Sequence, residues 1–434
     1  MKPQIPDASA SLEIWFNYLD QHYHQRIELG LERITQVARE LSLDQPLASQ
    51  VFTVAGTNGK GTTCCTLEAI LLAAGYRVGV YSSPHLLCFT ERVRIQGAEP
   101  AESAYTAAFS LIEHTRVRMG VALTFFEYTT LVALQLFRQA ALEAVILEVG
   151  LGGRLDAVNL VDADIAVITT IALDHTDWLG PDRESIGYEK AGIFRPQRPA
   201  VIGELAPPHS MITRAKQLQA PLFQRGIDWF FEIQADVWHW HDHQGCLSEL
   251  PLPQVPLENA ATALAALRCS PLVVDRAAVV RGLQQAWLPG RFQILQRTPH
   301  YLIVDIAHNP QAVAYLADQL LALRQRQPQL GKLHAVVGML SDKDIPGSLA
   351  AIKLQVDQWY CAPIAGEGER QGTVQCLLEW LPPTAQAFEG VLAAWQQAMQ
   401  SAQQNEIVVV FGSFHTVAPV LQALEAEGLD KHSA

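Results

Sequence analysis

The sequence predicts an α/β protein with two parallel-sheet domains, the second smaller than the first. Three observations lead to this prediction. Short runs of β-branched residues alternate with longer stretches of helical spacing, which is typical of βα units around a mostly parallel sheet. The chain has 434 residues, too many for one ordinary core and suited to two or three domains. Hydrophobic residues make up 49% and charged residues 17%, which favours a globular chain over a disordered one.

The predicted strands form two series along the chain. The first series covers residues 51–55, 77–81, 144–149, 165–171 and 200–203, and the second covers residues 301–306, 334–339, 358–362 and 407–411. Helical spacing is clear at Ile34, Val37, Ala38 and Leu41, and again over the Ala-rich residues 259–268. Each series predicts one open α/β sheet, and such sheets bind ligands beyond the carboxyl ends of their strands.

A Pro289-Gly290 pair separates the two series and favours a turn that interrupts any helix. We therefore place the domain boundary beside it, with a first domain over residues 1–288 and a second over residues 289–434. No internal repeat of solenoid period occurs in the sequence.

The chain carries a formal net charge of −13, so its mean field repels phosphate groups. We expect no nucleic-acid partner and no membrane partner, and any anionic substrate must meet positive charge concentrated at particular residues. No apolar run approaches the roughly 20 residues that span a bilayer, and the N-terminus lacks the basic-then-apolar order of a signal peptide. The seven cysteines include no Cys-x-x-Cys pair. We expect a reduced, cytoplasmic, monomeric protein.

A glycine-rich segment, Gly56-Thr57-Asn58-Gly59-Lys60-Gly61-Thr62, follows the first predicted strand and precedes a predicted helix over residues 63–74. Glycines let backbone N–H groups approach a polyphosphate, the helix N-terminus adds positive potential, and Lys60 supplies a cation to the β- and γ-phosphates. The spacing departs from Gly-x₄-Gly-Lys-Ser/Thr because Gly61 separates Lys60 from Thr62. The alternative is a strand-to-helix turn without a ligand. We favour a P-loop mononucleotide-binding domain, with Lys60 solvated when no nucleotide is bound.

Polar residues follow three further predicted strands of the first domain. Tyr81-Ser82-Ser83-Pro84-His85 follows one strand, Glu148 closes an apolar run, and His175 follows Asp174 after a third. A carboxylate at a strand end beside a phosphate loop is typical of sites that hold Mg²⁺, a hard cation that prefers oxygen ligands. A lone histidine such as His175 is more often a hydrogen-bonded loop residue than a ligand. Lys190, on a helix, is ordinarily a solvated surface residue.

Two other segments have simpler interpretations. Cys64 and Cys65 open the helix after the glycine-rich segment, where a thiol pKa can fall, but packing against the sheet is favoured. Residues 238–243 read Trp-His-Trp-His-Asp-His, so a strand would put three imidazoles on one face as a candidate metal site. Because no carboxylate or cysteine completes the set on that face, we favour an exposed hairpin strand and assign this segment no function.

Eight motifs, in the same order, resemble those of the folylpolyglutamate synthases of the Mur ligase superfamily. They occupy residues 56–62, 81–85, 148–156, 173–176, 189–193, 289–292, 305–310 and 412–413. The resemblance runs from about Ile27 to about Thr416, nearly the whole chain. Leu-Gly-Leu-Glu-Arg at residues 29–33 and Leu-Thr-Phe-Phe-Glu-Tyr at residues 123–128 are most similar to the bifunctional dihydrofolate synthase/folylpolyglutamate synthases of bacteria.

The resemblance implies a role for particular residues in each part of the site. ATP would be bound by Gly56, Thr57, Asn58, Gly59, Lys60, Gly61, Thr62, Asn259, Arg291 and Asp305. Two Mg²⁺ sites would use Ser83 and Glu148 for one ion and His175 for the other. The pterin or folate would contact Glu28, Leu29, Thr124, Phe125, Phe126, Glu127, Leu155, Asp156 and Ala157. His308 and Ser413 would bind glutamate, Lys190 would be carbamylated, and the catalytic residues would be Lys60, Lys190 and His308.

The implied activity is that of an ATP-dependent ligase acting on dihydropteroate, reduced folates and L-glutamate. ATP would activate a carboxylate as an acyl phosphate, which the glutamate amine then attacks. This would give a dihydrofolate synthase and a tetrahydrofolate synthase in one chain. The implied fold is a P-loop domain carrying the pterin pocket, followed by a smaller Rossmann-like α/β domain that binds glutamate. Three alternatives stay open: another Mur-type ligase acting on muramyl peptides, a P-loop kinase, and a nucleotide-gated switch protein.

Overall fold

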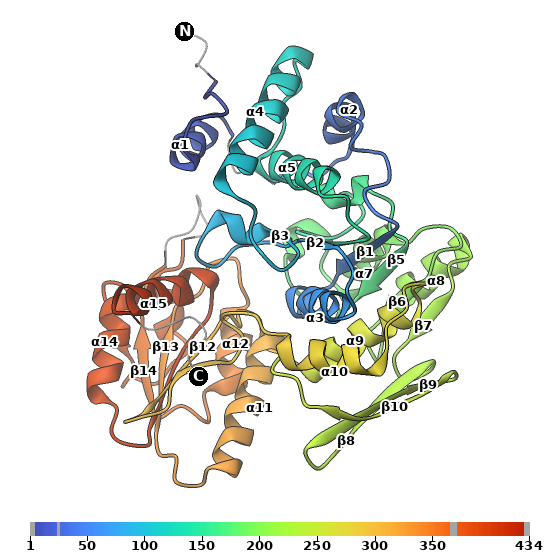
Figure 1. Ribbon diagram of the computed structural model, residues 1–434. Helices are drawn as coiled ribbons and strands as arrows, with labels where there is room; N and C mark the ends of the chain where they lie inside the picture. The colour runs from blue at the N-terminus through green and yellow to red at the C-terminus, as the bar shows by residue number, and fades with distance from the viewer. Residues whose placement is uncertain (1–4, 24–26, 365–370, 429–434) are drawn as a thin grey trace. The chain divides into compact units, whose positions relative to one another are not determined.

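The computed structural model of the chain describes residues 5–23, 27–364 and 371–428. It divides into two compact units: Met1–His85 with Phe89–Trp287 form unit 1, and Leu86–Cys88 with Leu288–Ala434 form unit 2. Each unit has its own mostly parallel sheet with helices packed on it (Figure 1). The predicted fold class is therefore confirmed. The assignment of Leu86–Cys88 to unit 2 has no counterpart in the sequence pattern.

The main sheet of unit 1 has seven strands in the order β3-β2-β4-β1-β5-β6-β7. Only β3 is antiparallel to its neighbour. The strands are β1 (Gln50–Ala55), β2 (Val78–Tyr81), β3 (Val93–Ile95), β4 (Ala144–Glu148), β5 (Ile165–Ile168), β6 (Ala200–Ile202) and β7 (Leu222–Gln224). The five predicted strands of the first series correspond to β1, β2, β4, β5 and β6, whereas β3 and β7 were not predicted. All six residues of β1 are buried because it lies between β4 and β5.

The helices of unit 1 include the two regions with predicted helical spacing. They are α1 (Leu12–His22), α2 (Glu32–Glu40), α3 (Lys60–Ala73), α4 (Glu102–Met119), α5 (Phe125–Gln139), α6 (Thr176–Leu179), α7 (Arg183–Lys190), α8 (His209–Leu218), α9 (Leu257–Arg268) and α10 (Arg276–Gln285). Three short 3₁₀ turns are η1 (Phe89–Arg92), η2 (Ala157–Leu160) and η3 (Ala191–Ile193). In α2, Ile34, Val37 and Ala38 are buried, as their spacing predicts.

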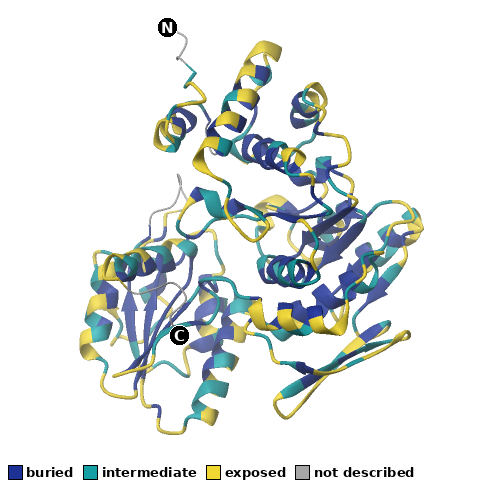
Figure 2. Cartoon of the chain, in the orientation of Figure 1, coloured by how far each residue is buried: buried dark blue, intermediate teal, exposed yellow. Residues whose placement is uncertain are grey.

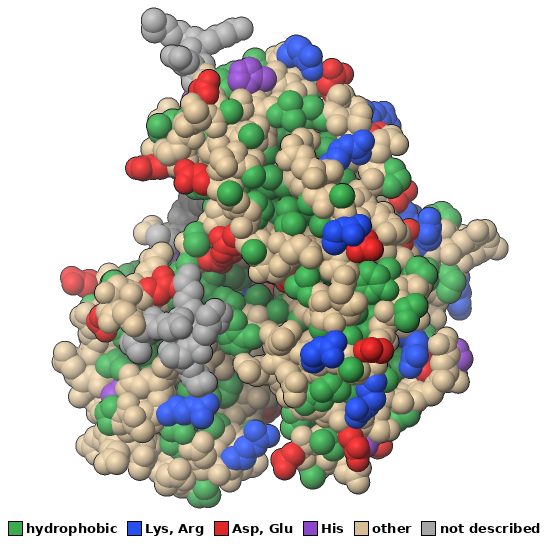
Figure 3. All heavy atoms as spheres, in the orientation of Figure 1, with side chains coloured by type: hydrophobic (Ala, Val, Ile, Leu, Met, Phe, Trp, Pro, Cys, Tyr) green, Lys and Arg blue, Asp and Glu red, His purple; other side chains and the backbone are tan. Residues whose placement is uncertain are grey.

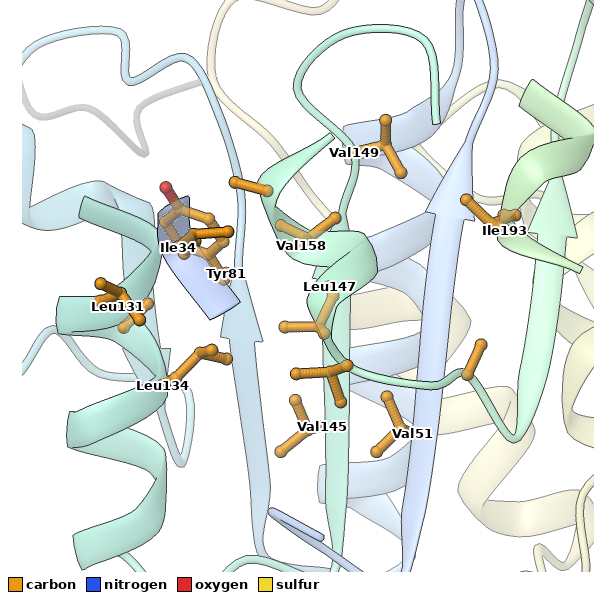
Figure 4. Packing of buried hydrophobic residues seen from close by; sticks show 14 of the residues in the cluster. Ile34, Val51, Tyr81, Leu131, Leu134, Val145, Leu147, Val149, Val158 and Ile193 are labelled. Atoms are coloured by element: carbon orange, nitrogen blue, oxygen red, sulfur yellow. The ribbon is translucent and has the colours of Figure 1, made fainter. Parts of the chain in front are cut away.

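One part of the core of unit 1 lies between the sheet and α5. Figure 4 shows Val145 and Leu147 of β4 on the side of the sheet where Leu131 and Leu134 of α5 lie, and all four are buried in the same cluster. Figure 2 shows the central strands of the seven-stranded sheet as buried, and every residue of β1, β2, β4, β5 and β6 is buried. These strands therefore appear in the sequence as apolar runs rather than as alternating patterns.

Helix α3 follows the glycine-rich segment and packs against α9 and α10. It begins at Lys60, so the predicted start at residue 63 is wrong: Gly59, with φ of 87°, turns the chain directly into the helix as its N-cap. Cys64 and Cys65 are buried, and burial raises the pKa of both thiols, that of Cys65 to about 11. The packing role is confirmed and the alternative of a lowered thiol pKa is wrong.

A separate antiparallel sheet in unit 1 contains β8 (Trp229–Gln234), β9 (Val237–Asp242) and β10 (Gly245–Pro251). Strand β9 alternates as predicted, with Trp238 and Trp240 buried and the intervening His239 partly exposed. The indole N–H of Trp240 donates to the carbonyl oxygen of Ala261 in α9, at 3.1 Å. The predicted hairpin strand is confirmed. Within the described ranges, no group of three or more His, Cys, Asp or Glu side chains is placed to hold a metal ion.

Unit 2 has a six-stranded sheet in the order β11-β12-β16-β13-β14-β15, parallel except for β11. Its strands are β11 (Gln293–Gln296), β12 (Tyr301–Asp305), β13 (Leu333–Val337), β14 (Gln358–Cys361), β15 (Gln386–Ala387) and β16 (Ile407–Phe411). Its helices are α11 (Pro310–Arg326), α12 (Ile345–Ile352), α13 (Val374–Leu378), α14 (Val391–Ser401) and α15 (Phe414–Ala426). The four predicted strands of the second series correspond to β12, β13, β14 and β16.

The surface carries mixed charge. On the face shown in Figure 3, basic and acidic side chains are interspersed among polar and apolar ones. In the part of the chain that the structure describes, no helix is both long and apolar enough to cross a membrane. Because the surface charge is mixed, the positive charge that an anionic ligand requires must come from individual residues, which are described next.

Candidate active site

The carboxyl ends of β4, β1 and β5 bring three chain segments together at one edge of the unit 1 sheet. Strand β1 pairs with β4 on one side and β5 on the other, with Val54 opposite Glu148 and Ala55 opposite Ile168. The residues that follow β1 therefore lie between Glu148 and Thr169. Parallel sheets bind ligands at this edge.

The glycine-rich segment leaves β1 at Gly56 and enters α3 at Lys60. A Cβ atom at Gly56 would lie 1.8 Å from Oγ1 of Thr169, and one at Gly59 would lie 2.3 Å from Oδ1 of Asn259. Both glycines also have positive φ, 150° and 87°. This backbone path requires glycine at both positions, and it ends at a helix N-terminus, where the dipole favours an anion.

Lys60 lies within this loop rather than in open solvent. Its ammonium nitrogen donates to the carbonyl oxygens of Gly56, at 3.0 Å, and Thr57, at 3.3 Å. The side chain is half-buried, so the expectation of a solvated lysine is wrong. The cation is thus held at the segment that the sequence predicts to bind phosphate.

Side chains from distant parts of unit 1 fix the loop. Oγ1 of Thr169 donates to the carbonyl oxygen of Asn58 at 2.6 Å, and the N–H of Asn58 donates to Oγ1 of Thr170 at 3.1 Å. Nδ2 of Asn259, in α9, donates to Oγ1 of Thr62 at 2.8 Å. Sequence reasoning missed Thr169 and Thr170. The available signal was a pair of threonines directly after the apolar run of β5.

Lys190, at the end of α7, is buried at the same loop. Its ammonium nitrogen donates to the carbonyl oxygen of Gly56 at 3.0 Å, so Lys60 and Lys190 share one acceptor. Only 4% of Lys190 is exposed, and the alternative of a solvated helix residue is wrong. Burial, followed by the charge of Lys60, lowers the pKa of Lys190 to about 7, while Asp174 and Asp156 act in the opposite direction.

The expected metal ligands lie at the ends of three strands of this sheet. Glu148 is buried at the end of β4, and Oε2 of its carboxylate accepts a hydrogen bond from the N–H of Ser83, at 3.3 Å. His175 is the N-cap of α6 and has φ of 52°, and its N–H donates to Oδ1 of Asp174 at 2.9 Å. The structure brings Ser83 and Glu148 together, and it places His175 on the loop after β5.

The expected pterin residues come from three segments that contact one another. The guanidinium of Arg33 binds Glu28 and also Glu127, at 3.2 Å. The N–H of Gly30, next to the half-buried Leu29, donates to the carbonyl oxygen of Leu155 at 3.3 Å. Thus the chain before α2, the start of α5 and the turn before η2 meet in unit 1.

Helix α5 begins at these residues with a capping box. Oγ1 of Thr124 accepts from the N–H of Glu127, and Glu127 accepts from the N–H of Thr124. The ring of Phe126 lies against Gly150, where a Cβ atom would approach Cζ of the ring to 2.6 Å. Phe125, beside it, is half-buried.

Asp156 fixes the loop that follows β4. Its carboxylate accepts from the N–H groups of Leu151, at 2.8 Å, and Val158, at 3.1 Å, and Ala157 begins η2 directly after it. Burial raises the pKa of Asp156 to about 6, against the effect of these backbone hydrogen bonds. The side chain therefore has a clear structural task in addition to any contact with a ligand.

In unit 2, Arg291 and Asp305 lie next to the turn before β11. The carboxylate of Asp305, at the end of β12, accepts from the N–H groups of Phe292 and Ala307, each at 2.7 Å. Burial raises its pKa. The guanidinium of Arg291 lies over the ring of Phe414, with Cζ at 5.4 Å from the ring centroid.

His308 and Ser413 follow two adjacent strands, β12 and β16. Nδ1 of His308 lies 2.9 Å from the carbonyl oxygen of Ile306, and Ser413 caps α15 by accepting from the N–H of His415 at 3.2 Å. Because Asp305 pairs with Phe411 in the sheet, the two loops start side by side. Both expected glutamate residues thus lie at the ligand-binding edge of the unit 2 sheet.

Two protein-family models match this chain, one over the region of the first series of strands and one over the region of the second. The Mur ligase middle domain matches residues 54–227, and the Mur ligase glutamate ligase domain matches residues 290–414. The dihydrofolate synthase/folylpolyglutamate synthase of Escherichia coli strain K12 is 54% identical over 423 residues, covering 98% of each chain. The protein of the same name from Haemophilus influenzae is 44% identical, covering 96% of this chain and 98% of that one.

Solved structures give the same result. E. coli FolC in complex with DHPP and ADP has a TM-score of 0.92 and 54% identity, over 98% of this chain and all of that one. A bifunctional folylpolyglutamate synthase/dihydrofolate synthase with Mn, AMPPNP and L-glutamate bound has a TM-score of 0.90 and 55% identity, over 97% of this chain and all of that one. The kinase, switch-protein and muramyl-ligase alternatives are set aside. The chain belongs to the dihydrofolate synthase/folylpolyglutamate synthase family of Mur ligases, which are ATP-dependent ligases.

Proposed function

We propose that this protein joins L-glutamate to dihydropteroate, forming dihydrofolate, and then adds further glutamates to reduced folates. The observation that carries the proposal is the pair of lysines on one carbonyl oxygen. Nζ of Lys60 and Nζ of Lys190 both lie 3.0 Å from the carbonyl oxygen of Gly56, at the loop that follows β1. A phosphate loop with a buried second lysine fits a site that binds ATP and a divalent metal, and a solved relative has AMPPNP and Mn bound.

The proposed reaction has two steps. An oxygen of the substrate carboxylate attacks the γ-phosphorus of ATP, and the bond to the bridging oxygen breaks, releasing ADP. The glutamate amine then attacks the acyl carbon, phosphate leaves with the former carboxylate oxygen, and the amine loses a proton. Because phosphoryl transfer depends mostly on positioning and charge stabilisation, we assign both tasks to the loop and Lys60.

We assign the ATP contacts of unit 1 to residues 56–62 and Asn259, and those of unit 2 to Arg291 and Asp305. The hydrogen bond from Asn259 to Thr62 supports a positioning role for Asn259 in addition to contact with the nucleotide. Residues 1–288 would then form the ATP- and pterin-binding domain. Residues 289–434, besides the ATP contacts of Arg291 and Asp305, would bind glutamate through His308 and Ser413.

We propose two Mg²⁺ sites, one at Ser83 and Glu148 and a second at His175. The buried carboxylate of Glu148 beside Ser83 fits a hard cation, and the small number of protein donors suits Mg²⁺, which keeps several waters and phosphate oxygens as ligands. Bound there, Mg²⁺ would neutralise charge on the phosphate oxygens. Ser83 and Glu148 would hold the ion beside the loop, and His175 would hold the other from the far side of β1.

We propose that Lys190 is carbamylated. The neutral amine attacks the carbon of CO₂, an N–C bond forms, one C=O bond becomes C–O⁻, and a proton is released. This reaction requires the neutral amine, which a pKa of about 7 makes available near neutral pH. The carbamate converts a buried cation into an oxygen donor, which suits a site for a metal and phosphate.

We assign the expected pterin residues to the substrate as one group, because their segments contact one another. Arg33 forms ion pairs with Glu28 and Glu127, and the N–H of Gly30 donates to the carbonyl oxygen of Leu155.

We also propose that the protein is a cytoplasmic monomer. One chain supplies every residue assigned to the reaction, so no second copy is needed to complete the site.

The experiment that tests this function is an ADP-release assay on the purified chain. Dihydropteroate, tetrahydrofolate and a muramyl peptide precursor are each supplied with and without L-glutamate. We expect sustained ADP formation with the first two substrates only when glutamate is also present. ADP formation in the absence of all three carboxylate substrates contradicts the proposal. ADP formation with the muramyl substrate but with neither dihydropteroate nor tetrahydrofolate also contradicts it.

A further inference from the structure

Arg92, at the end of η1, is a buried cation between the expected pterin residues and the expected metal residues. Only 9% of it is exposed. Its guanidinium carbon lies 5.5 Å from the ring centroid of Phe89 and 5.8 Å from that of Phe125, one of the expected pterin residues. Its Nε donates to Nδ1 of His85 at 2.9 Å. Its backbone carbonyl oxygen accepts from the N–H of Ser82, next to Ser83.

The guanidinium has donors to spare. Within the described residues, the only hydrogen bond from its side chain is the one from Nε to His85, and no carboxylate pairs with it. In the described part of the chain, neither Nη atom of Arg92 makes a hydrogen bond to the protein, and neither is fully buried. Both therefore remain accessible to solvent. A buried guanidinium ordinarily pairs with an anion, and its two Nη atoms match the two oxygens of a carboxylate.

We propose that Arg92 binds the carboxylate of the pterin substrate and positions it for attack on the γ-phosphorus. This inference rests on the proposed function. The activated carboxylate lies at the opposite end of the substrate from the pterin ring, and Arg92 lies between Phe125 and the segment of Ser83. The protein as a whole is acidic, with a net charge of −13, so its mean field does not attract a carboxylate. The attraction must come from an individual cation such as Arg92.

The test compares two ligands on the full-length enzyme: dihydropteroate and the same molecule without its carboxylate. Titration calorimetry gives the Kd of each for the wild type, Arg92→Gln and Arg92→Lys, with Arg118→Gln, an exposed arginine of α4, as the control for charge removal. We expect Arg92→Gln to weaken dihydropteroate binding about 10- to 100-fold, and to leave the carboxylate-free ligand within about threefold. Arg92→Lys should recover part of the loss, because it keeps the charge but not the paired donors.

The outcomes separate this inference from the function on which it rests. Equal weakening of both ligands means that Arg92 only holds its segment in place, and this overturns the inference. Unchanged binding of both ligands to Arg92→Gln also overturns it. If the wild-type chain binds neither ligand and forms no ADP with either folate substrate, the proposed function itself fails. Binding of the carboxylate-free ligand also reports that a variant is folded.

Discussion

The ligand-binding edges of the two sheets are built in different ways. In unit 1, the contacts that fix the loop span long stretches of sequence: 112 residues from Asn58 to Thr170, 134 from Gly56 to Lys190, and 197 from Thr62 to Asn259. In unit 2, the contacts described for His308 and Ser413 each reach only two residues along the chain. The loop of unit 1 is therefore positioned by side chains that are distant in the sequence, whereas the contacts described for His308, Ser413 and Asp305 of unit 2 span at most 13 residues.

This difference indicates where a substitution should matter most. In unit 1, a single side chain supports the loop to which we assign the phosphates of ATP, so its loss should affect the chemical step. In unit 2, a single side chain supports a local cap, so its loss should affect one substrate and local stability. The predictions below test this contrast, from the largest expected effect to the smallest.

Lys60→Ala should lower ligase turnover about a thousandfold, because it removes the cation held at the phosphate loop. The measurement is kcat for ADP formation with dihydropteroate and glutamate, together with a thermal melt to establish that the variant is folded. Lys216→Ala, an exposed lysine of α8 in the same unit, is the matched control and should be fully active. Near-normal turnover by folded Lys60→Ala would remove the loop from the mechanism.

Glu148→Ala should reduce dihydropteroate ligation and folate ligation together, each several hundredfold, because one strand end serves both reactions. The two activities are measured in parallel on the same preparation, with Glu232→Ala, an exposed residue of β8, as the control. Loss of one activity with retention of the other would show that the two reactions use separate sites.

Lys190→Ala should lower kcat about 10- to 100-fold, in the range seen when a group that supports a metal site is removed. Acetate or formate should restore part of the activity of Lys190→Ala, and Lys190→Arg should be impaired to a similar extent although it keeps the positive charge. Because the pKa of Lys190 is about 7, wild-type enzyme depleted of CO₂ should regain activity from bicarbonate more fully at pH 8 than at pH 6. ¹³C NMR with labelled bicarbonate detects the carbamate directly, and an unmodified lysine in fully active enzyme would refute the assignment.

Ser413→Ala should have the smallest effect. Loss of the N-cap of α15 should lower the free energy of unfolding by about 1 kcal/mol, and the KM for glutamate should rise about tenfold, with the KM for ATP unchanged. Ser401→Ala, at the exposed end of α14, is the control. A large fall in kcat with unchanged KM for glutamate would contradict the contrast between the two units.

The fold was largely predictable because most strands of both sheets are buried and appear as apolar runs. Strand β3 was missed because it has three residues, one of them Arg94, which pairs with Glu68. Strands β8 and β10 were missed because much of each is exposed, which leaves no apolar run. The start of α3 was misplaced because Lys60, Gly61 and Thr62 were interpreted as loop, whereas a left-handed Gly59 starts the helix earlier.

The site was predictable where a motif is contiguous and not where it depends on strand pairing. Residues 56–62 can be singled out in the sequence because a glycine-rich segment with a lysine follows an apolar run. The support from Thr169 and Thr170 depends on β5 pairing with β1. The surroundings of Arg92 depend on η1, an unpredicted 3₁₀ turn, and on the approach of Phe125 from α5. Contacts of this kind join residues that are distant in the sequence, so they become visible only once the strand pairing is known. Lys190 is likewise buried where its ammonium meets the carbonyl oxygen of Gly56, 134 residues away in the sequence.

The central claim is that ATP activates the substrate carboxylate as an acyl phosphate. Dihydropteroate with ¹⁸O in both carboxylate oxygens, incubated with ATP, glutamate and the wild-type chain, tests this most directly. Phosphate released during ligation is analysed by mass spectrometry. The account predicts one ¹⁸O atom in each phosphate, transferred when the glutamate amine displaces the acyl phosphate. Unlabelled phosphate accompanying dihydrofolate formation would contradict it.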